Sequence, residues 1–506
     1  MSKYAYILFT RVPVPNKVKT RLQSLLSGEE ACQVQQEILL DSFQKFDCLN
    51  EYGIDLYLAY SDEGDPSSLL STLPKNFHSF QQYGATIGQR MNHAIKFIFA
   101  KGYEKVVLTG SDIPNLDTTI IQSAFHQMRE IVFGPSPDGG YYLVGCTQSI
   151  DLTPIFETNI SWGKSEVLKQ TLQHLTDYQV DFLSPLQDVD YPEDLKMLQH
   201  DLKKENQYLM YWLEENRGLL MRKVIFDCDN TFGLADHDVD DGLTLLYLLG
   251  APTIDLLGVT LTYGNGSLEE VEKMTKELQQ RLTLSFDYYS ANQAEYLVKQ
   301  VNLYPNEITI LATGALTNLS EALRIDPNFF KKVQEVVLMG GTIEPLKVNH
   351  RLVTELNFSC DPDAAKSVLL SQTNLTIMNG HMTSEAFFSR HEMNQFLTLV
   401  EATINQDTLK WIHQTLENWI KWNEKVFGFS GFCNWDMTTA VYLERPELFS
   451  QERYNLSKNQ LTLTKGRMTL TDKSDYSIKM PKKILDIAEF NQLVIKRMTL
   501  AFKKED

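Results

Sequence analysis

The sequence lacks the cysteine pattern of a disulfide scaffold or of a zinc site. Its 506 residues contain only six cysteines, which are scattered along the chain with no CxxC pair and no metal-ligand spacing. Such a distribution favours buried free thiols in a reducing compartment over a disulfide framework. The six are Cys32, Cys48, Cys146, Cys228, Cys360 and Cys433.

Long hydrophobic runs are also missing. The longest uncharged apolar stretch, Gly242–Ile254, contains Gly250 and Pro252 and is too short to cross a bilayer. The N-terminus offers only Tyr4–Thr10 before Arg11, which is too short for the core of a signal peptide and is typical of a first β-strand. We therefore expect a soluble, cytoplasmic protein.

Basic residues are in deficit. Lys and Arg total 47 against 65 for Asp and Glu, which gives a net charge of −18 and a pI near 5.1. This balance argues against a broad basic face for nucleic acid and against binding to an anionic membrane. We therefore expect small-molecule partners, with no nucleic acid and no membrane. A small anionic substrate stays open wherever basic residues gather locally.

The length and the residue pattern predict two α/β domains with mainly parallel sheets, because 506 residues are roughly three times a typical single domain. Short β-branched or aromatic runs alternate with helical patterns throughout. The strands expected in the first half are Tyr4–Thr10, Ile54–Tyr60, Lys105–Thr109, Ile131–Gly134 and Tyr141–Val144. Those expected in the second half are Lys223–Asp227, Asp255–Thr262, Ile308–Ala312, Glu335–Met339 and Leu375–Met378. Apolar residues recur at helical spacing in Glu29–Phe46, Leu268–Leu282 and Leu409–Val426.

The boundary between the halves is expected near Leu219. The preceding residues are rich in Lys, Glu, Gln and long apolar side chains and contain no Gly/Ser tract, which predicts helices rather than a flexible tether. We divide the chain into a first domain at 1–205, a helical connector at 206–221 and a second domain at 222–506.

The most informative stretch of the second half is an acidic loop after a predicted strand, Asp227 to Asp241. Six aspartates occupy it, and they repel one another unless a cation neutralises them. Their oxygen ligands favour Ca²⁺ or Mg²⁺ over zinc, and the loop lies where open α/β sheets bind ligands. The alternative, a solvated acidic loop or helix start, is common for one or two aspartates.

This loop resembles the N-terminal signature of the inosine-uridine preferring nucleoside hydrolase family, with an insertion between its two Asp pairs and without the Pro-Gly turn. Further segments follow in the order found in that family. They are Val259–Leu268, Ala312–Leu319, Val336–Gly341, the spaced set Asn349, Glu355, Asn357 and Asp361-Pro362, and Asn434–Asp436. The resemblance covers the chain from about Lys223 onward.

The resemblance implies Ca²⁺-dependent hydrolysis of the N-glycosidic bond of ribonucleosides, a reaction with an oxocarbenium-like transition state. The implied ligands of the ion are Asp229, Asp241, Asp436 and the carbonyl of Thr313. Asp229 would also take the proton from the attacking water. The implied ribose contacts are Asp240 and Asn357 for the 2′- and 3′-hydroxyls, Asn349 and Glu355 for the 5′ end, and Asn265 beside the ion or the ribose. We also expect a homo-oligomer formed through this domain.

Trp435 departs from the family pattern, because several members carry His immediately before the last metal-binding Asp. An indole cannot protonate a departing base, but it can stack on one. His350 and His381 are alternative acids, although a lone His is more often structural. The competing function is therefore a nucleoside- or metal-binding module that has lost catalysis.

The first half carries a basic loop behind its first strand. Arg11, Lys17, Lys19 and Arg21 suggest a phosphate site, whereas the simpler alternative is a solvated basic loop before a helix. Later segments, with Trp162 among them, join this loop in resembling a bacterial family of glycosyltransferase-A-fold proteins of the DUF2064 type, similar to nucleotidyltransferases. They are Gly84–Met91, Val106–Pro114, Gly134–Leu143 and Asp188–Leu195.

That second resemblance implies a transferase that acts on a nucleotide or nucleotide-sugar. Asp112 and Asp190 would bridge Mg²⁺ or Mn²⁺ to a diphosphate. Arg11, Lys19 and Arg21 would neutralise phosphates. Asp138 and the two glycines after it would let the backbone approach the acceptor or sugar. The alternative is an inert scaffold that binds nucleotide without turning it over. Taken together, the two halves predict a bifunctional enzyme.

Overall fold

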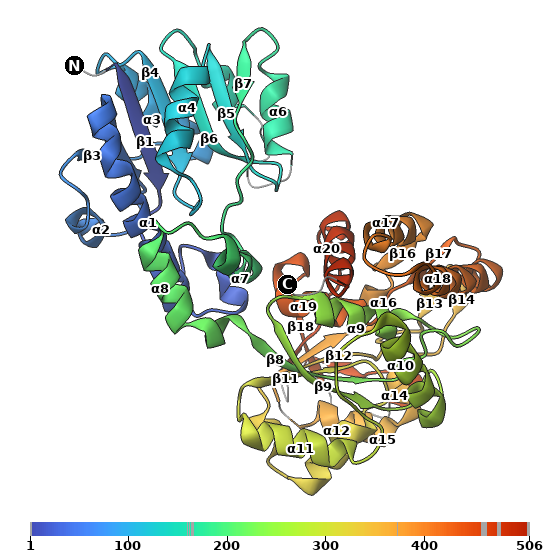
Figure 1. The fold of residues 1–506 in the computed structure, drawn as a ribbon. Coiled ribbons are helices and arrows are strands. Elements are labelled where there is room, and N and C mark those ends of the chain that lie inside the picture. The colour runs from blue at the N-terminus through green and yellow to red at the C-terminus, as the bar shows by residue number, and fades with distance from the viewer. Residues whose placement is uncertain are drawn as a thin grey trace. The chain divides into compact units, whose positions relative to one another are not determined.

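The computed structural model describes residues 3–158, 160, 162, 166–371, 373–456, 463–472 and 477–502. By its internal contacts the chain divides into two compact units, Met1–Leu220 and Met221–Asp506, and each is described by itself (Figure 1). Both are α/β units with mostly parallel sheets, so the predicted fold class is confirmed. Among the described residues, no helix is both long and apolar enough to cross a membrane.

The sheet of the first unit has the strand order β3-β2-β1-β4-β6-β5-β7 in the described residues. The strands are β1 (Tyr4–Thr10), β2 (Ile54–Tyr60), β3 (Phe77–Gln81), β4 (Lys105–Gly110), β5 (Ile131–Pro135), β6 (Tyr141–Thr147) and β7 (Val180–Phe182). β6 is antiparallel to both of its neighbours, and the other pairs are parallel. Side chains alternate across β1, so that Tyr6 and Leu8 pack on one face and Ala5 and Ile7 on the other.

Helices cover both faces of this sheet (Figure 1). They are α1 (Gly28–Phe46), α2 (Ser67–Ser71), α3 (Ile87–Phe99), α4 (Thr118–Gln127), α5 (Thr153–Phe156) and α6 (Val167–Gln173). Two further helices, α7 (Pro192–Asp201) and α8 (Gln207–Glu215), pack in a separate cluster with α1, and short 3₁₀ turns span Thr20–Ser24, Asp47–Tyr52 and Arg217–Leu220. The segment that we expected as a connector forms α8 and the last turn. α8 packs on α1 through Leu209 and Trp212, and Asp41 of α1 accepts hydrogen bonds from its first turn.

The sheet of the second unit has the order β10-β9-β8-β11-β12-β15-β20-β18-β19 in the described residues. Its strands are β8 (Arg222–Cys228), β9 (Ile254–Leu261), β10 (Tyr288–Tyr289), β11 (Ile308–Ala312), β12 (Glu335–Met339), β15 (Leu375–Met378), β18 (Arg453–Leu456), β19 (Leu470–Thr471) and β20 (Ser477–Lys479). All are parallel except β18, which is antiparallel to both β19 and β20. Two hairpins lie outside the sheet, β13 (Lys347–Val348) with β14 (Arg351–Leu352), and β16 (Phe387–Ser389) with β17 (Gly431–Cys433).

Helices also cover both faces of the second sheet. One layer contains α9 (Asp240–Gly250), α10 (Leu268–Leu282), α16 (Gly380–Thr383), α17 (Arg390–Val400), α18 (Gln406–Phe427), α19 (Met437–Glu444) and α20 (Ile487–Leu500). The other contains α11 (Gln293–Leu303), α12 (Thr317–Ile325), α13 (Phe329–Lys332), α14 (Asn357–Cys360) and α15 (Pro362–Leu369). Short 3₁₀ turns span Pro446–Leu448 and Thr464–Gly466. Figure 1 shows α11, α12 and α15 on the side of the sheet opposite α9, α19 and α20.

The carboxyl ends of β8, β9, β11 and β12 meet at one edge of the sheet, because these strands are parallel neighbours. Asp227 lies near the end of β8 and Asp229 follows that strand. Asn265 follows β9, and Thr313 follows β11. Gly264 has a φ of +156°, and a Cβ there would lie 2.3 Å from Asp229 Oδ2. Only glycine therefore lets the β9 loop approach this carboxylate.

Candidate functional site

The second unit contains a buried group of three carboxylates. Asp240 and Asp241 form the first turn of α9, and Asp436 precedes the first turn of α19. One ligand oxygen from each lies within 4.8 Å of the others. The backbone N–H of Asp436 donates to Asp240 Oδ2 at 3.2 Å, which joins the two helix ends.

Asp229 is a fourth buried carboxylate in contact with this group. Its Oδ2 accepts a hydrogen bond from the backbone N–H of Asn265, and its side chain shares a hydrogen bond with Asp241. Asp241 also accepts from Thr313 Oγ1 at 2.6 Å. Asp229 Oδ1 is buried and has no hydrogen-bond partner among the described residues. An orphaned carboxylate oxygen of this kind calls for a ligand.

Burial is the largest cause of the raised pKa of every carboxylate in this cluster. It raises the pKa of Asp229 to about 6, and it holds the pKa values of Asp241 and Asp436 well above their ordinary range. The negative charge of neighbouring aspartates adds to the shift. In the absence of a cation, burial therefore favours the protonated form of these groups over their simultaneous ionisation, whereas a divalent ion would let them ionise together.

A cavity of about 130 Å³ opens beside these carboxylates. Seven of the predicted site residues line it, namely Asp240, Asn265, Thr313, Glu355, Asn357, Trp435 and Asp436. Asn357 Nδ2 donates to the carbonyls of Thr313 and Met339, at 2.8 and 3.0 Å. Glu355 accepts from the Phe358 N–H, and its burial raises its pKa to about 7. The structure thus brings most of the predicted ribose contacts to one wall.

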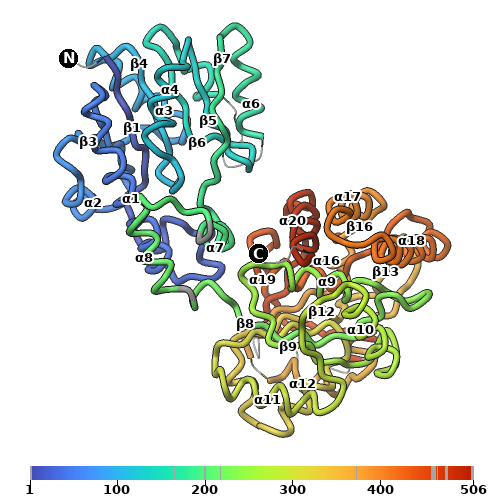
Figure 2. The backbone as a smooth tube through the Cα atoms, viewed as in Figure 1, coloured from blue at the N-terminus to red at the C-terminus, as the bar shows by residue number. Residues whose placement is uncertain are grey.

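Asn349 lies away from that wall. It occupies, with His350, the two-residue turn between β13 and β14, and both residues have positive φ. Its Nδ2 donates to the carbonyl of Phe427 at 2.6 Å, and Figure 2 shows β13 beside α18. Asn349 is absent from the described residues that line the cavity. The hairpin turn therefore holds this amide at the end of α18.

A second cavity, of about 280 Å³, adjoins the first. The two share the wall residues Asp238, Asn265, Val353, Leu356 and Trp435. Its other walls include four aromatic side chains, Trp419, Trp422, Phe427 and Phe432. We call this cavity the aromatic chamber. The sequence pattern predicts only an amphipathic helix over Leu409–Val426 and does not predict this chamber. The close spacing of Trp419 and Trp422 is the signal that could have indicated it.

In the first unit, five predicted residues line one cavity of about 310 Å³. They are Arg11, Lys19, Arg21, Asp112 and Asp190. The ammonium of Lys19 lies 3.0 Å from Asp112 Oδ1, and Arg21 pairs with Asp190. The predicted cations and carboxylates therefore neutralise one another.

Asp138 is outside the described lining of this cavity, and its Oδ1 accepts from the Gly140 N–H at 3.0 Å. Asp188, which the sequence did not single out as a site residue, is close to these acids. Burial, and then the charges of Asp190, Asp138 and Asp112, raise the pKa of Asp188 to about 7. The charges of Asp188 and of these three acids therefore act on one another.

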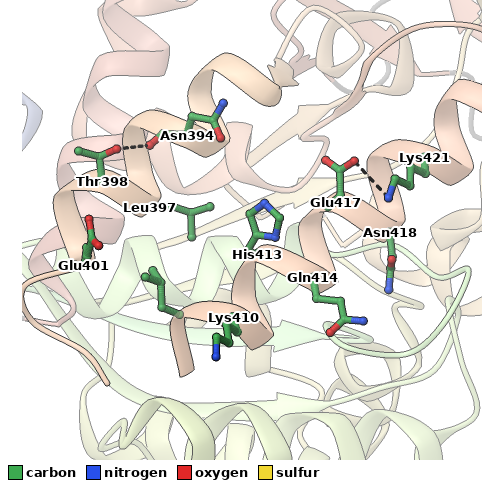
Figure 3. A pocket seen from close by; sticks show the side chains of 11 residues that line it. Asn394, Leu397, Thr398, Glu401, Lys410, His413, Gln414, Glu417, Asn418 and Lys421 are labelled. Carbon is green, nitrogen blue, oxygen red and sulfur yellow. Dashed lines mark hydrogen bonds and ion pairs between the residues drawn. The ribbon is translucent and has the colours of Figure 1, made fainter. Parts of the chain in front are cut away.

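A larger groove, of about 650 Å³, lies between α17 and α18 (Figure 3). Side chains of both signs line it, including Glu401, Lys410 and His413, and Lys421 pairs with Glu417 at 3.5 Å. It contains none of the predicted site residues. We therefore assign it no role in the chemistry of the two sites above.

Comparison with known proteins supports the two-part reading. Residues 279–492 match the family described as "Inosine-uridine preferring nucleoside hydrolase". The second unit contains a nucleoside hydrolase domain. Residues 43–164 match "Uncharacterized protein conserved in bacteria (DUF2064)". Both resemblances expected from the sequence are thereby confirmed.

Several curated relatives and solved structures resemble parts of the chain. Uridine nucleosidase 1 of Arabidopsis thaliana is 25% identical over 256 residues, which cover 43% of this chain and 74% of the relative. Pyrimidine-specific ribonucleoside hydrolase RihB of Escherichia coli is 26% identical over 200 residues, which cover 32% of this chain and 61% of the relative. The plant nucleoside hydrolase PpNRh1 is 20% identical, covering 55% of this chain and 99% of its own, with a TM-score of 0.46. A protein from Desulfovibrio desulfuricans, provisionally described as a nucleotide-diphospho-sugar transferase, is 31% identical, covering 43% and 97%, with a TM-score of 0.40.

The raised pKa values predict how the stability of the cation-free nucleoside hydrolase domain depends on pH. Asp229 and Asp227, with pKa values of about 6 and about 7, bind more protons when folded than in the unfolded chain, where the ordinary value is 3.8. Stability should therefore fall as pH rises from about 4 through about 7. Calcium should raise the Tm of this domain more at pH 8 than at pH 5, as calorimetry with and without a chelator will show. An equal calcium effect at both pH values would contradict the cation site.

Proposed function

We propose that the nucleoside hydrolase domain cleaves the N-glycosidic bond of ribonucleosides with a Ca²⁺ ion held by Asp229, Asp241, Asp436 and the Thr313 carbonyl. The observation that carries this proposal is the buried carboxylate cluster with the orphaned Asp229 Oδ1. All its donors are oxygens, which Ca²⁺ prefers. A bound Ca²⁺ supplies Lewis acidity toward the attacking water and the ribose hydroxyls.

Side chains of the protein carry out proton transfer, hydroxyl binding and charge stabilisation in the proposed reaction. Asp229 accepts a proton from the attacking water, since its Oδ1 is buried and has no hydrogen-bond partner among the described residues. Asp240 and Asn357 bind the 2′- and 3′-hydroxyls. The amide nitrogen of Asn357 is held by two carbonyls, which leaves its oxygen to accept from the sugar. The negative charge of the cluster stabilises the ribosyl cation as it forms.

Trp435 lies on the side of the same cavity that would face the nucleobase. It lines both the ribose-sized cavity and the aromatic chamber, so an indole stacked on the base would hold the glycosidic bond in line. We assign Asn265 to the ion side and Glu355 to the 5′ end of the ribose. Asn349 would reach the 5′ end only if its bond to the Phe427 carbonyl opens. The competing function is binding of nucleosides or metal without turnover.

The first prediction from this proposal concerns Asp241. Asp241→Ala should abolish tight Ca²⁺ binding and release of free base, because it removes the carboxylate that joins Asp229 to Thr313. Asp241→Asn keeps the shape and should give the same loss. Asp287→Asn, an exposed aspartate far from these contacts in the sequence, is the matched control and should behave as wild type. The measurement is calorimetric titration with Ca²⁺. Unchanged Ca²⁺ affinity in the Asp241 variants would contradict the proposed ion site.

The second prediction concerns Trp435. Stacking contributes about 0.5–1.5 kcal/mol beyond burial, which is less than the roughly 10²–10⁴-fold of a general acid. Hydrolysis should therefore be slow for uridine and faster for the activated p-nitrophenyl riboside, with inosine favoured among common nucleosides. Trp435→Ala should lose much of the purine preference, and Trp435→His should regain acid-assisted cleavage. Measured kcat/KM values that are equal for uridine and the activated riboside would show that another acid operates.

We propose, separately, that residues 1–205 form a nucleotide-sugar or nucleotidyl transferase that depends on Mg²⁺ or Mn²⁺, which makes the protein bifunctional. Support comes from the cavity where Lys19 and Arg21 face Asp112 and Asp190. The alternative is a scaffold that binds nucleotide without turnover. We further propose a cytoplasmic location and a homo-oligomer formed through residues 222–506.

This proposal predicts coupled binding. To bind phosphates, Lys19 and Arg21 must break their ion pairs with Asp112 and Asp190, and a divalent ion needs the same carboxylates to be released. Each ligand should therefore bind more tightly when the other is present. Titration of the full chain with a nucleotide panel, with and without Mn²⁺, measures this effect, and Asp112→Ala should remove the metal dependence. Absence of binding by every nucleotide would contradict the proposal, and binding that ignores Mn²⁺ would favour the scaffold.

A further inference from the structure

The aromatic chamber has an unusual combination of walls. Aromatic rings from two chain segments line it, and Trp419 and Trp422 stack on each other with ring centres 4.7 Å apart. The exposed carboxylate of Asp236 also lines it, and its described lining contains no lysine and no arginine. Asp238 lines it too, but burial and the charge of Asp240 raise the pKa of that carboxyl group well above its ordinary value. Aromatic faces together with carboxylates attract a flat cation, through cation–π contacts and charge pairing.

The chamber lies where the base of a bound nucleoside would go. It shares Asp238, Asn265 and Trp435 with the ribose-sized cavity, so a ring attached at C1′ passes from one cavity into the other. The volume of about 280 Å³ is sufficient for a substituted heteroaromatic ring. The chamber therefore selects by charge as well as by stacking.

We propose that the preferred substrates are ribonucleosides whose base is a cationic heteroaromatic ring, such as a pyridinium or an N-alkylated purinium. This inference rests on the proposed hydrolase function of the same site. It also accounts for Trp435, because a cationic ring departs without being protonated.

The reaction balances without an acid on the base side. The C1′–N bond breaks, and its electron pair goes to the ring nitrogen, which neutralises the positive charge of the ring. Water forms the new C1′–O bond, one of its protons stays on the anomeric hydroxyl, and the other goes to Asp229 and then to solvent. The products are ribose, a neutral base and one proton.

The alternative to a cationic base is a general acid in the chamber, and His237 is the candidate. It lines the chamber, and since the Ala235 carbonyl can only accept, Nδ1–H is the donor of their 2.7 Å hydrogen bond. This bond leaves Nε2 as the nitrogen that could protonate a neutral base. If His237 protonates the base, then neutral nucleosides are cleaved with the help of an acid even though Trp435 cannot supply one. A cationic ring then has no catalytic advantage over a neutral base.

The test compares two ligands that differ in charge. Nicotinamide riboside carries a pyridinium ring, and benzamide riboside is its neutral, carbon-linked counterpart. Binding to the full chain is measured by tryptophan fluorescence with calcium chelated, and release of base is measured separately with calcium present. We expect nicotinamide riboside to bind about 2- to 30-fold more tightly than benzamide riboside. Equal affinities would overturn the inference, whether or not the protein hydrolyses nucleosides.

Variants assign the effect to the chamber. Asp236→Asn and Trp422→Leu should each shrink the affinity ratio of the two ligands, whereas the surface variant Asp287→Asn should keep it. Loss of uridine cleavage in His237→Gln, with uridine as good a substrate as nicotinamide riboside in wild type, would overturn the inference. Selective binding without any release of base would support the chamber and contradict the hydrolase function.

Discussion

The burial of like charges at the carboxyl edge of one sheet is the constraint on which the second unit depends. Asp229, Asp240, Asp241 and Asp436 reach this edge from the end of β8 and from the starts of α9 and α19. Each is almost fully buried, and isolated burial of a carboxylate costs several kcal/mol unless protons or cations compensate. The surrounding hydrogen bonds orient the carboxylates but supply no positive charge. Such a cluster fits the cation that we propose for this site.

The neighbouring elements serve that cluster. Asp227, which precedes it on β8, accepts hydrogen bonds from Thr260 and Asn318 and so ties the strand to β9 and α12. Asn357 fixes the Thr313 and Met339 carbonyls on the next two strands. The carboxylate cluster and the adjoining cavity of about 130 Å³ are therefore parts of one hydrogen-bonded frame. The aromatic chamber extends this frame with side chains from α18, which comes from a distant part of the sequence.

Much of this architecture is predictable from residue patterns. All ten predicted strands form, and the largest boundary shift is that of β6, which continues to Thr147. The β18–β20 strands escaped prediction because they are short and partly polar. Pairing rather than local propensity stabilises them, since β20 pairs with β15, β18 with β20 and β19 with β18. The motif spacing predicts that Glu355 and Asn357 lie together, and both line the cavity. The spacing could not show that the hairpin turn places Asn349 beside the end of α18. The close spacing of Trp419 and Trp422 is a local signal for an aromatic cluster, but only the tertiary fold joins these two residues to Trp435 in one chamber.

We propose above all that this site adds water to the C1′ carbon of a nucleoside with the help of a bound cation. The most direct measurement is mass spectrometry of the products formed in ¹⁸O-labelled water, with calcium added or chelated. We expect free ribose that carries the heavy oxygen, an unlabelled base, and no product after chelation. Ribose transferred to another acceptor, unlabelled ribose, or full turnover in the presence of the chelator would contradict it.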